Sequence, residues 1–234
     1  MALVHVRVLR ERVAGEVSRR TDPYPAIPGV NTGVPAGSIS AQVIEQVANI
    51  ARTELGYDVG AIGEFPRETN SNNIFARLDF QLNPDHRLTL RHNLVDAEAH
   101  RSHGGTGANF GYETSGHRFT STTNSTVAQL NSNFGGGLFN EFRVGATFIR
   151  DARQIGTPFT RIRVDLGGPN NIQFGPDNFS PRNALDQDIL EITNDLSFAR
   201  GAHTITLGTS NEFFRFSNLF VRNPYGFWRF PSFE

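Results

Sequence analysis

Apolar and polar residues alternate over long stretches of this chain. Between residues 72 and 82, Leu78 and Phe80 occupy alternate positions, while Arg77 and Asp79 fall on the other side. Because successive side chains of a β-strand point to opposite faces, this order predicts a strand with one apolar and one polar face. The same alternation recurs in the segments 87–97, 119–134, 138–151, 185–198 and 203–220.

These segments form three pairs, each joined by a very short polar or glycine-bearing link, which predicts the hairpins 72–97, 119–151 and 185–220. The connections between the hairpins, roughly 98–117 and 153–183, are longer and polar. Tight periplasmic turns that alternate with long extracellular loops are typical of outer-membrane barrels. We therefore predict an all-β fold: an antiparallel up-and-down transmembrane β-barrel segment of about six to eight long strands, forming an incomplete barrel.

The length of the segments favours a membrane barrel over a soluble sheet. Strands of about ten residues fit a tilted crossing of roughly 25–30 Å of hydrocarbon, whereas strands of soluble sheets average about five or six residues. His92 and Asn194 fall on the apolar face. A polar side chain is costly near the middle of a bilayer, so we expect both residues near an interface, unless the local register differs.

One segment has a helical period. From Ser40 to Leu55, apolar residues such as Val43, Val47 and Ile50 recur at helical spacing, and Ser40 is a candidate N-cap. We predict a short amphipathic helix near 40–55, inside a long extracellular loop over 10–71.

Composition excludes several classes of function. The 234 residues include 22 Lys+Arg and 23 Asp+Glu, a net charge of -1, so no broad basic field is present to bind nucleic acid. The absence of cysteine excludes disulfides and thiol nucleophiles. The first twelve residues lack the apolar core and cleavage site of a secretory signal, which an outer-membrane protein needs.

Charged residues on the polar faces of the strands are read as a hydrated lumen wall that contacts a plug. Their spacing matches neither a Ser–His–Asp triad nor a pair of catalytic carboxylates, so we predict no catalytic residues and no enzyme activity. The predicted wall residues are Arg77, Asp79, Arg91, Glu141, Arg143, Glu191 and Glu212.

Histidines concentrate at His92, His100, His103 and His117, and the spacing of His100 and His103 loosely resembles that of metal ligands. No carboxylate or third ligand follows at a defined offset, so we read this segment as a polar loop and predict neither a metal nor a cofactor.

Aromatic residues crowd the C-terminal end of the chain. We predict that they form an aromatic girdle near the outer membrane interface, although girdles favour Trp and Tyr over Phe. A platform for stacking carbohydrate is the alternative. The predicted girdle residues are Phe214, Phe216, Tyr225, Phe227 and Trp228.

Several stretches of the sequence, in this order and spacing, resemble the Oar-like TonB-dependent outer-membrane transporters, over roughly residues 40 to 230. They are NIFARLDF at 73–80, HRLTLRHN at 86–93, LFNEFRVG at 138–145, NALDQDI at 183–189, HTITLGT at 203–209 and NEFF at 211–214. The resemblance implies a large barrel closed around a plug. Nothing in the chain resembles a plug domain or a TonB box, and the chain ends at 233–234 without the family's terminal aromatic strand. We therefore expect one partial barrel domain over residues 1–234.

The resemblance implies a place in the bacterial outer membrane and a share in nutrient uptake. The expected partners are outer-membrane lipid, a plug domain and the TonB energy-coupling complex in the intact parent protein, and an unknown small-molecule or peptide substrate. The alternative is a soluble all-β adhesion or glycan-binding module, with the aromatic cluster as its site.

Overall fold

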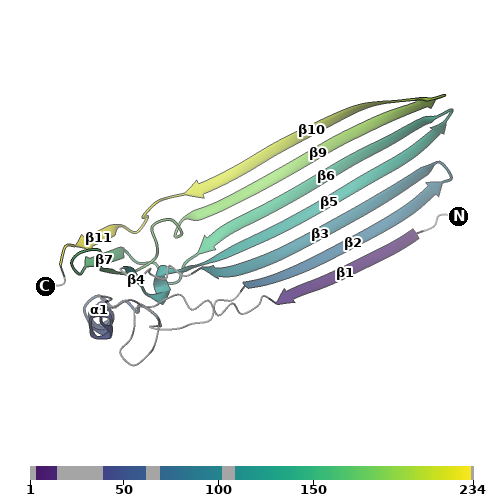
Figure 1. Ribbon diagram of the computed structural model, residues 1–234. Helices are drawn as coiled ribbons and strands as arrows, with labels where there is room; N and C mark the ends of the chain where they lie inside the picture. Colours follow the sequence, from purple (N-terminus) through teal and green to yellow (C-terminus); the bar gives the residue numbers. More distant parts are fainter. Residues whose placement is uncertain (1–3, 15–38, 62–68, 102–108, 233–234) are drawn as a thin grey trace.

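The computed structural model describes residues 4–14, 39–61, 69–101 and 109–232. Within these ranges the chain forms one large antiparallel sheet and a small folded layer at one end of it (Figure 1). The large sheet has the order β1-β2-β3-β5-β6-β9-β10. Its strands are β1 Val4–Ala14, β2 Thr69–Asn83, β3 His86–Arg101, β5 His117–Gly135, β6 Leu138–Gln154, β9 Asn183–Arg200 and β10 His203–Phe220. The predicted all-β antiparallel fold with a short helix is confirmed.

Three tight turns at one end of the sheet each join the two strands of a predicted hairpin. Two-residue turns at 84–85, 136–137 and 201–202 connect β2 to β3, β5 to β6 and β9 to β10. Gly137 has φ +83°, and a Cβ atom there would lie 2.2 Å from the carbonyl oxygen of Ala199 in the next hairpin. Only glycine fits both this backbone conformation and this close approach.

Register gives the large sheet one apolar and one polar face. Leu90 pairs with Leu78 on β2 and with Ala128 on β5, and Val144 pairs with Ala128 and with Ile192 on β9. We call the side of the sheet that carries these residues the apolar face. Residues one position along each strand make up the polar face, because the register shifts only beside two of the tight turns, after Gln81 and after Asn133.

The apolar face is not covered by another layer of the described chain. Several of its large side chains are exposed, among them Phe142, Phe148, Leu207 and Phe213. The cluster of buried apolar residues that forms the hydrophobic core draws no member from the long strands. Within the described residues the sheet also stays open, with β1 at one edge and β10 at the other. This sheet is therefore not half of a two-layer soluble core.

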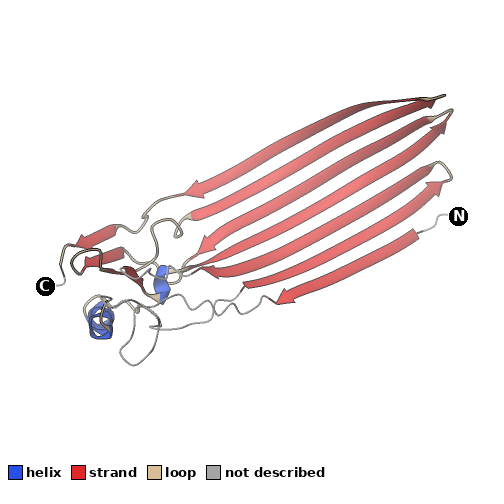
Figure 2. Cartoon of the chain, in the orientation of Figure 1, coloured by secondary structure: helices blue, strands red, loops and turns tan. Residues whose placement is uncertain are grey.

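The hydrophobic core lies in the small layer, which we call the cap. It consists of α1 (Ala41–Thr53), η1 (Glu113–Ser115) and a small sheet of order β11-β7-β8-β4. The strands of this sheet are β4 Asn109–Gly111, β7 Arg161–Asp165, β8 Asn171–Phe174 and β11 Phe227–Phe230. Figure 2 shows the helix and these short strands gathered at the end of the large sheet opposite the tight turns.

Helix α1 forms where its sequence predicts. The Ser40 side chain accepts a hydrogen bond from the Val43 backbone amide, which caps the N-terminus. Ile44, Val47, Ala48 and Ala51 are buried against the small sheet, since they recur at helical spacing on one side. Among the described residues, no helix is long and apolar enough to cross a bilayer.

Three expectations about the connections need correction. Residues 4–14 form β1 on the edge of the large sheet, so the predicted loop over 10–71 begins too early. The connections at 98–117 and 153–183 are not only polar loops, because β4, β7 and β8 arise within them. The residues of the 10–71 connection numbered 15–38 and 62–68 lie outside the described part of the chain.

On the apolar face, His92 lies between Leu90 and Leu94 along β3, and Asn194 lies between Ile192 and Leu196 along β9. The expected register holds, but neither residue is at the end of the apolar stretch of its strand. Each side chain has a polar neighbour across the strands: His92 Nδ1 lies 2.9 Å from Thr126 Oγ1, and Asn140 Nδ2 donates to Asn194 Oδ1 at 2.9 Å. These contacts reduce the cost of a polar group on an apolar face.

Candidate functional site

The predicted wall residues share one face of the large sheet and lie in neighbouring rows. One row crosses the sheet in the order Arg77, Arg91, Val127, Gly145, Glu191 and Glu212, each paired with the next. Asp79 and Arg143 lie in the adjacent row, and Glu141 lies in the row after that. The polar face therefore has arginines opposite each other near β2 and glutamates opposite each other near β10.

Some of these charges are paired within the face. Arg77 Nε and Nη2 donate to the two carboxylate oxygens of Asp79 at 2.7 and 2.8 Å, and Thr89 Oγ1 donates to the same carboxylate at 2.7 Å. Arg143 donates to Glu141, and Arg91 Nη2 donates to Gln129 at 3.1 Å. Bidentate and charge-assisted contacts of this kind fix side-chain direction in the plane of the face.

Other charged side chains on the same face have atoms without a partner in the described chain. The Nε atoms of Arg91 and Arg143 are buried and donate to no atom there. Glu191 and Glu212 are exposed and directly opposite each other, and neither carboxylate has a hydrogen bond or ion pair in the same part of the structure. Like charges opposite each other destabilise a strand pair, so this face is suited to contact water or a charged partner.

A polar hollow of about 520 Å³ lies on this side of the sheet near the tight turns. Arg87, Asn131, Glu141 and Asp195 contribute to its lining. The polar face therefore continues to the end of the strands where the turns lie.

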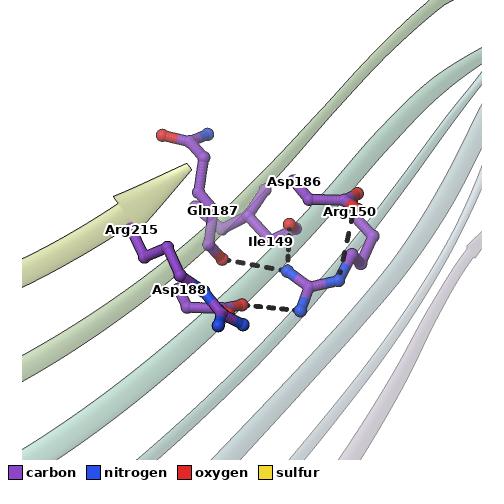
Figure 3. A network of polar contacts seen from close by, with 6 residues as sticks. All are labelled: Ile149, Arg150, Asp186, Gln187, Asp188 and Arg215. Carbon is purple, nitrogen blue, oxygen red and sulfur yellow. Dashed lines mark hydrogen bonds and ion pairs between the residues drawn. The ribbon is translucent and has the colours of Figure 1, made fainter. Parts of the chain in front are cut away.

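On the opposite face, a network of ion pairs marks where the apolar surface ends (Figure 3). Arg150 Nη2 and Arg215 Nη2 donate to the two carboxylate oxygens of Asp188 at 2.6 and 2.7 Å, and Arg150 Nε lies 3.9 Å from Asp186. Asp188 is directly opposite Phe148, the last large apolar residue of β6 before Arg150 on this face. The apolar surface thus ends in the row where the charges begin, on the side of the cap.

The cap is held together by buried aromatic and polar contacts between segments distant in sequence. Tyr112 donates to the backbone carbonyl of Ile44 on α1, and its ring lies edge-on to Phe110 at 4.9 Å. Burial raises the pKa of the Tyr112 phenol well above its ordinary value, so the group stays neutral and donates. The cap is therefore a folded unit that can hold side chains in fixed positions.

A charged cluster joins β7 to β11 at the edge of the cap. Arg163 Nε donates to one oxygen of Asp165 at 2.7 Å, and Arg229 Nε donates to the other at 2.6 Å. These two hydrogen bonds hold the pKa of Asp165 below its ordinary value. Arg161 lies over the ring of Phe227, with its guanidinium carbon 5.5 Å from the ring centre, and burial lowers the pKa of this arginine.

A histidine, an aspartate and a serine meet where β5 leaves the cap. His117 Nδ1 lies 3.0 Å from Ser180 Oγ and 3.3 Å from Asp177, which also accepts hydrogen bonds from the backbone amides of Phe179 and Ser180. Ser180 is fully buried, and both partners approach the same ring nitrogen. This geometry does not relay a proton from the serine to the carboxylate; it fixes the start of β5 to the loop before β9.

The predicted aromatic girdle does not form one belt. Phe214 and Phe216 stack at 5.5 Å on β10, but alternation places them on the polar face. Phe227 and Trp228 lie on β11 of the small sheet, and Tyr225 lies in the turn before it. The prediction of a single girdle is wrong, because the chain leaves the large sheet after residue 220 and β11 then pairs with β7 in the small sheet.

The predicted histidine concentration is dispersed. His92 and His100 lie on β3 and His117 begins β5, while His103 lies outside the described residues. His100 accepts a hydrogen bond from Arg118 at 3.1 Å. In the described segments, no group of three potential ligands gathers around one point.

Comparison with known proteins finds one family model, described as an outer membrane beta barrel domain, that matches residues 11–233. Searches of curated proteins and of solved structures return no match. The matched residues include the cap and all of the long strands except most of β1.

Proposed function

The chain belongs to the outer membrane beta barrel family, and from this premise we propose that it forms part of a TonB-dependent receptor that imports a scarce nutrient. The chain lies in the bacterial outer membrane, and its long strands serve as barrel wall. The soluble adhesion module is not favoured, because the apolar face has no protein layer over it in the described residues. The TonB-dependent, Oar-like identity rests on the sequence resemblance.

One observation carries the proposal: charged groups on the polar face that lack partners in the described chain. Water alone would solvate Glu191 and Glu212. The buried Nε atoms of Arg91 and Arg143 lack an acceptor, and a buried donor without one costs about 1–3 kcal/mol. A plug domain inside the barrel would supply donors to the glutamates and, once the two arginine side chains turn toward it, acceptors to the arginines. A plug is what a TonB-dependent receptor has and a simple pore lacks.

The arrangement of turns and connections supports an orientation. Short turns face the periplasm and long connections face the outside in bacterial barrels. The cap would then lie at the cell surface, where it meets a nutrient first, and the hollow near Arg87 would lie at the periplasmic end. In this role the wall binds and guides, and we propose that it performs no catalysis.

A genetic experiment tests the proposal. Three bacterial strains are compared: one without this gene, one without TonB and one without both. Each strain grows on a panel of media, and each medium supplies one scarce nutrient from a single source: an iron compound, a cofactor or an oligomer. We expect loss of the gene to slow growth on at least one source. Loss of TonB should cause the same defect, and the double deletion should add nothing. Normal uptake of that source in the strain without TonB would refute energy coupling.

A further inference from the structure

The cap contains a pocket of about 470 Å³ between α1 and the small sheet. Its volume lies in the range of about 300–1,000 Å³ that holds small-molecule ligands. The residues that line it come from α1 and its C-terminal end, from β7, β8 and β11, and from the segments beside them. They are Val47, Ile50, Leu55, Phe159, Thr160, Ile162, Val164, Phe174, Trp228, Phe230 and Ser232.

The lining determines the chemistry of the occupant. No charged side chain of the described residues contributes to it, so an ionic ligand would lose its hydration without compensation. Phe159 and Phe174 are stacked at 6.4 Å, with an angle of 23° between their planes, and Trp228 is 63% exposed on β11, the edge strand beside β7. Flat aromatic walls favour a flat, ring-bearing ligand.

A polar atom at the pocket is unsatisfied. Thr160 Oγ1 is buried and has no hydrogen-bond partner in the described part of the chain. Most buried hydroxyl groups in proteins are hydrogen-bonded. Thr160 lines the pocket, but its hydroxyl oxygen lies beneath the wall, so a ligand can bond to it only after the side chain turns toward the pocket. The backbone beside Thr160 is held in place, since the neighbouring Arg161 amide donates to Gly226 at 3.2 Å.

We propose that this pocket binds an uncharged, flat, ring-bearing small molecule through its aromatic and aliphatic walls and through one hydrogen bond to Thr160, whose side chain turns toward the ligand. The site goes beyond the transport proposal, because binding at the cap needs no energy coupling. Ile50 and Leu55, each 45% exposed, form the rim of the pocket on the side of α1.

The test uses the purified full chain in lipid nanodiscs and two probes, 2-naphthol and naphthalene. Trp228 is the only tryptophan of the chain, so quenching of its fluorescence reports the pocket directly. We expect saturable quenching by both probes. Thr160→Val should weaken 2-naphthol about 3- to 10-fold, as the loss of one hydrogen bond predicts, and should leave naphthalene binding unchanged.

A matched pair of helix variants controls for folding and for partition into lipid. Ile50→Glu puts a charge at the rim and should weaken both probes at least about tenfold. Asn49→Glu places the same charge on the neighbouring exposed residue, which does not line the pocket, and should leave binding unchanged. Far-ultraviolet circular dichroism and the unliganded emission of Trp228 check that both variants fold.

Three outcomes would overturn the proposal. Quenching that rises with lipid content and never saturates would indicate partition into the bilayer. No quenching in the folded chain would indicate that another segment of the chain occupies the pocket. Equal binding by Ile50→Glu and Asn49→Glu would place the probe elsewhere. Because the titration is done without TonB, none of these results bears on the transport proposal.

Discussion

Val144→Arg tests whether the apolar face of the large sheet contacts lipid. Val144 lies six residues from Arg150, where the ion-pair network begins, and six from Leu138, where β6 starts after its tight turn. Its neighbours across the strands, Ala128 and Ile192, are apolar. At about 3.4 Å per residue and a tilt of about 40°, six residues span about 15 Å along the membrane normal, which is half the hydrocarbon thickness.

An arginine at this depth should therefore lower the free energy of unfolding by close to the largest amount that a lipid-facing arginine costs in a barrel. That cost is about 2–4 kcal/mol, or about 30- to 700-fold in the folding equilibrium. Thr147→Arg is the matched control, because it introduces the same residue on the polar face of the same strand. Its cross-strand neighbours Ser125 and Ile189 are uncharged. Loss of its hydrogen bond to Ser125 should cost about 1 kcal/mol.

The assay is a guanidinium titration of the protein folded in phosphatidylcholine vesicles, followed by far-ultraviolet circular dichroism and by heat-dependent gel migration. If Val144→Arg prevents folding altogether, the amounts of both variants in the outer-membrane fraction of cells give a second readout. Equal losses for the two variants would refute the assignment of the faces, since an exposed arginine in water changes stability by only about 0.5 kcal/mol.

The remaining predictions concern the turns, the cap and the polar pairs. Gly137→Ala should lower the free energy of unfolding by at least about 1 kcal/mol more than Gly136→Ala in the same titration, because only the first places a Cβ against Ala199. Equal losses would show that the contact is not fixed. Asp165 has a lowered pKa, so its stabilisation of β7–β11 pairing is full at neutral pH and is lost as the pH falls below about 4. The fluorescence of Trp228 on β11 should change as this pairing is lost. The Asp165→Asn variant should show the same changed fluorescence already at pH 7. If that variant still shows an unchanged acid transition, Asp165 is not the cause of the transition. Asn194→Leu alone removes one of the two acceptors of Asn140 Nδ2, the other being the Asp195 carbonyl, and should destabilise the sheet, whereas adding Asn140→Leu should restore stability, with a coupling of about 0.5–1.5 kcal/mol in a double-mutant cycle. Additive effects would mean that the two amides do not interact.

Local pattern sufficed for the long hairpins and for α1. Alternation placed Arg77 and Glu191 on one face, and pairing within hairpins is local, so short turns such as Pro84-Asp85 set the register. The strands extend a few residues beyond the predicted bounds because hydrogen bonding to a neighbour continues into polar sequence. Strand β1 was missed, although Val4, Val6 and Val8 alternate, because its partner lies far away in the sequence.

The sequence by itself determined which residues of each long strand share a face, because a period of two follows from backbone geometry alone. Only the tertiary structure decided which charges meet between hairpins, such as Arg150 with Asp186 and Asp188. It also decided the cap: β4 pairs with β8 and β7 with β11 in parallel, between segments separated by long stretches of chain. Short strands of this kind leave almost no local signal, and their pairing depends on a shared core that forms only when the chain is folded.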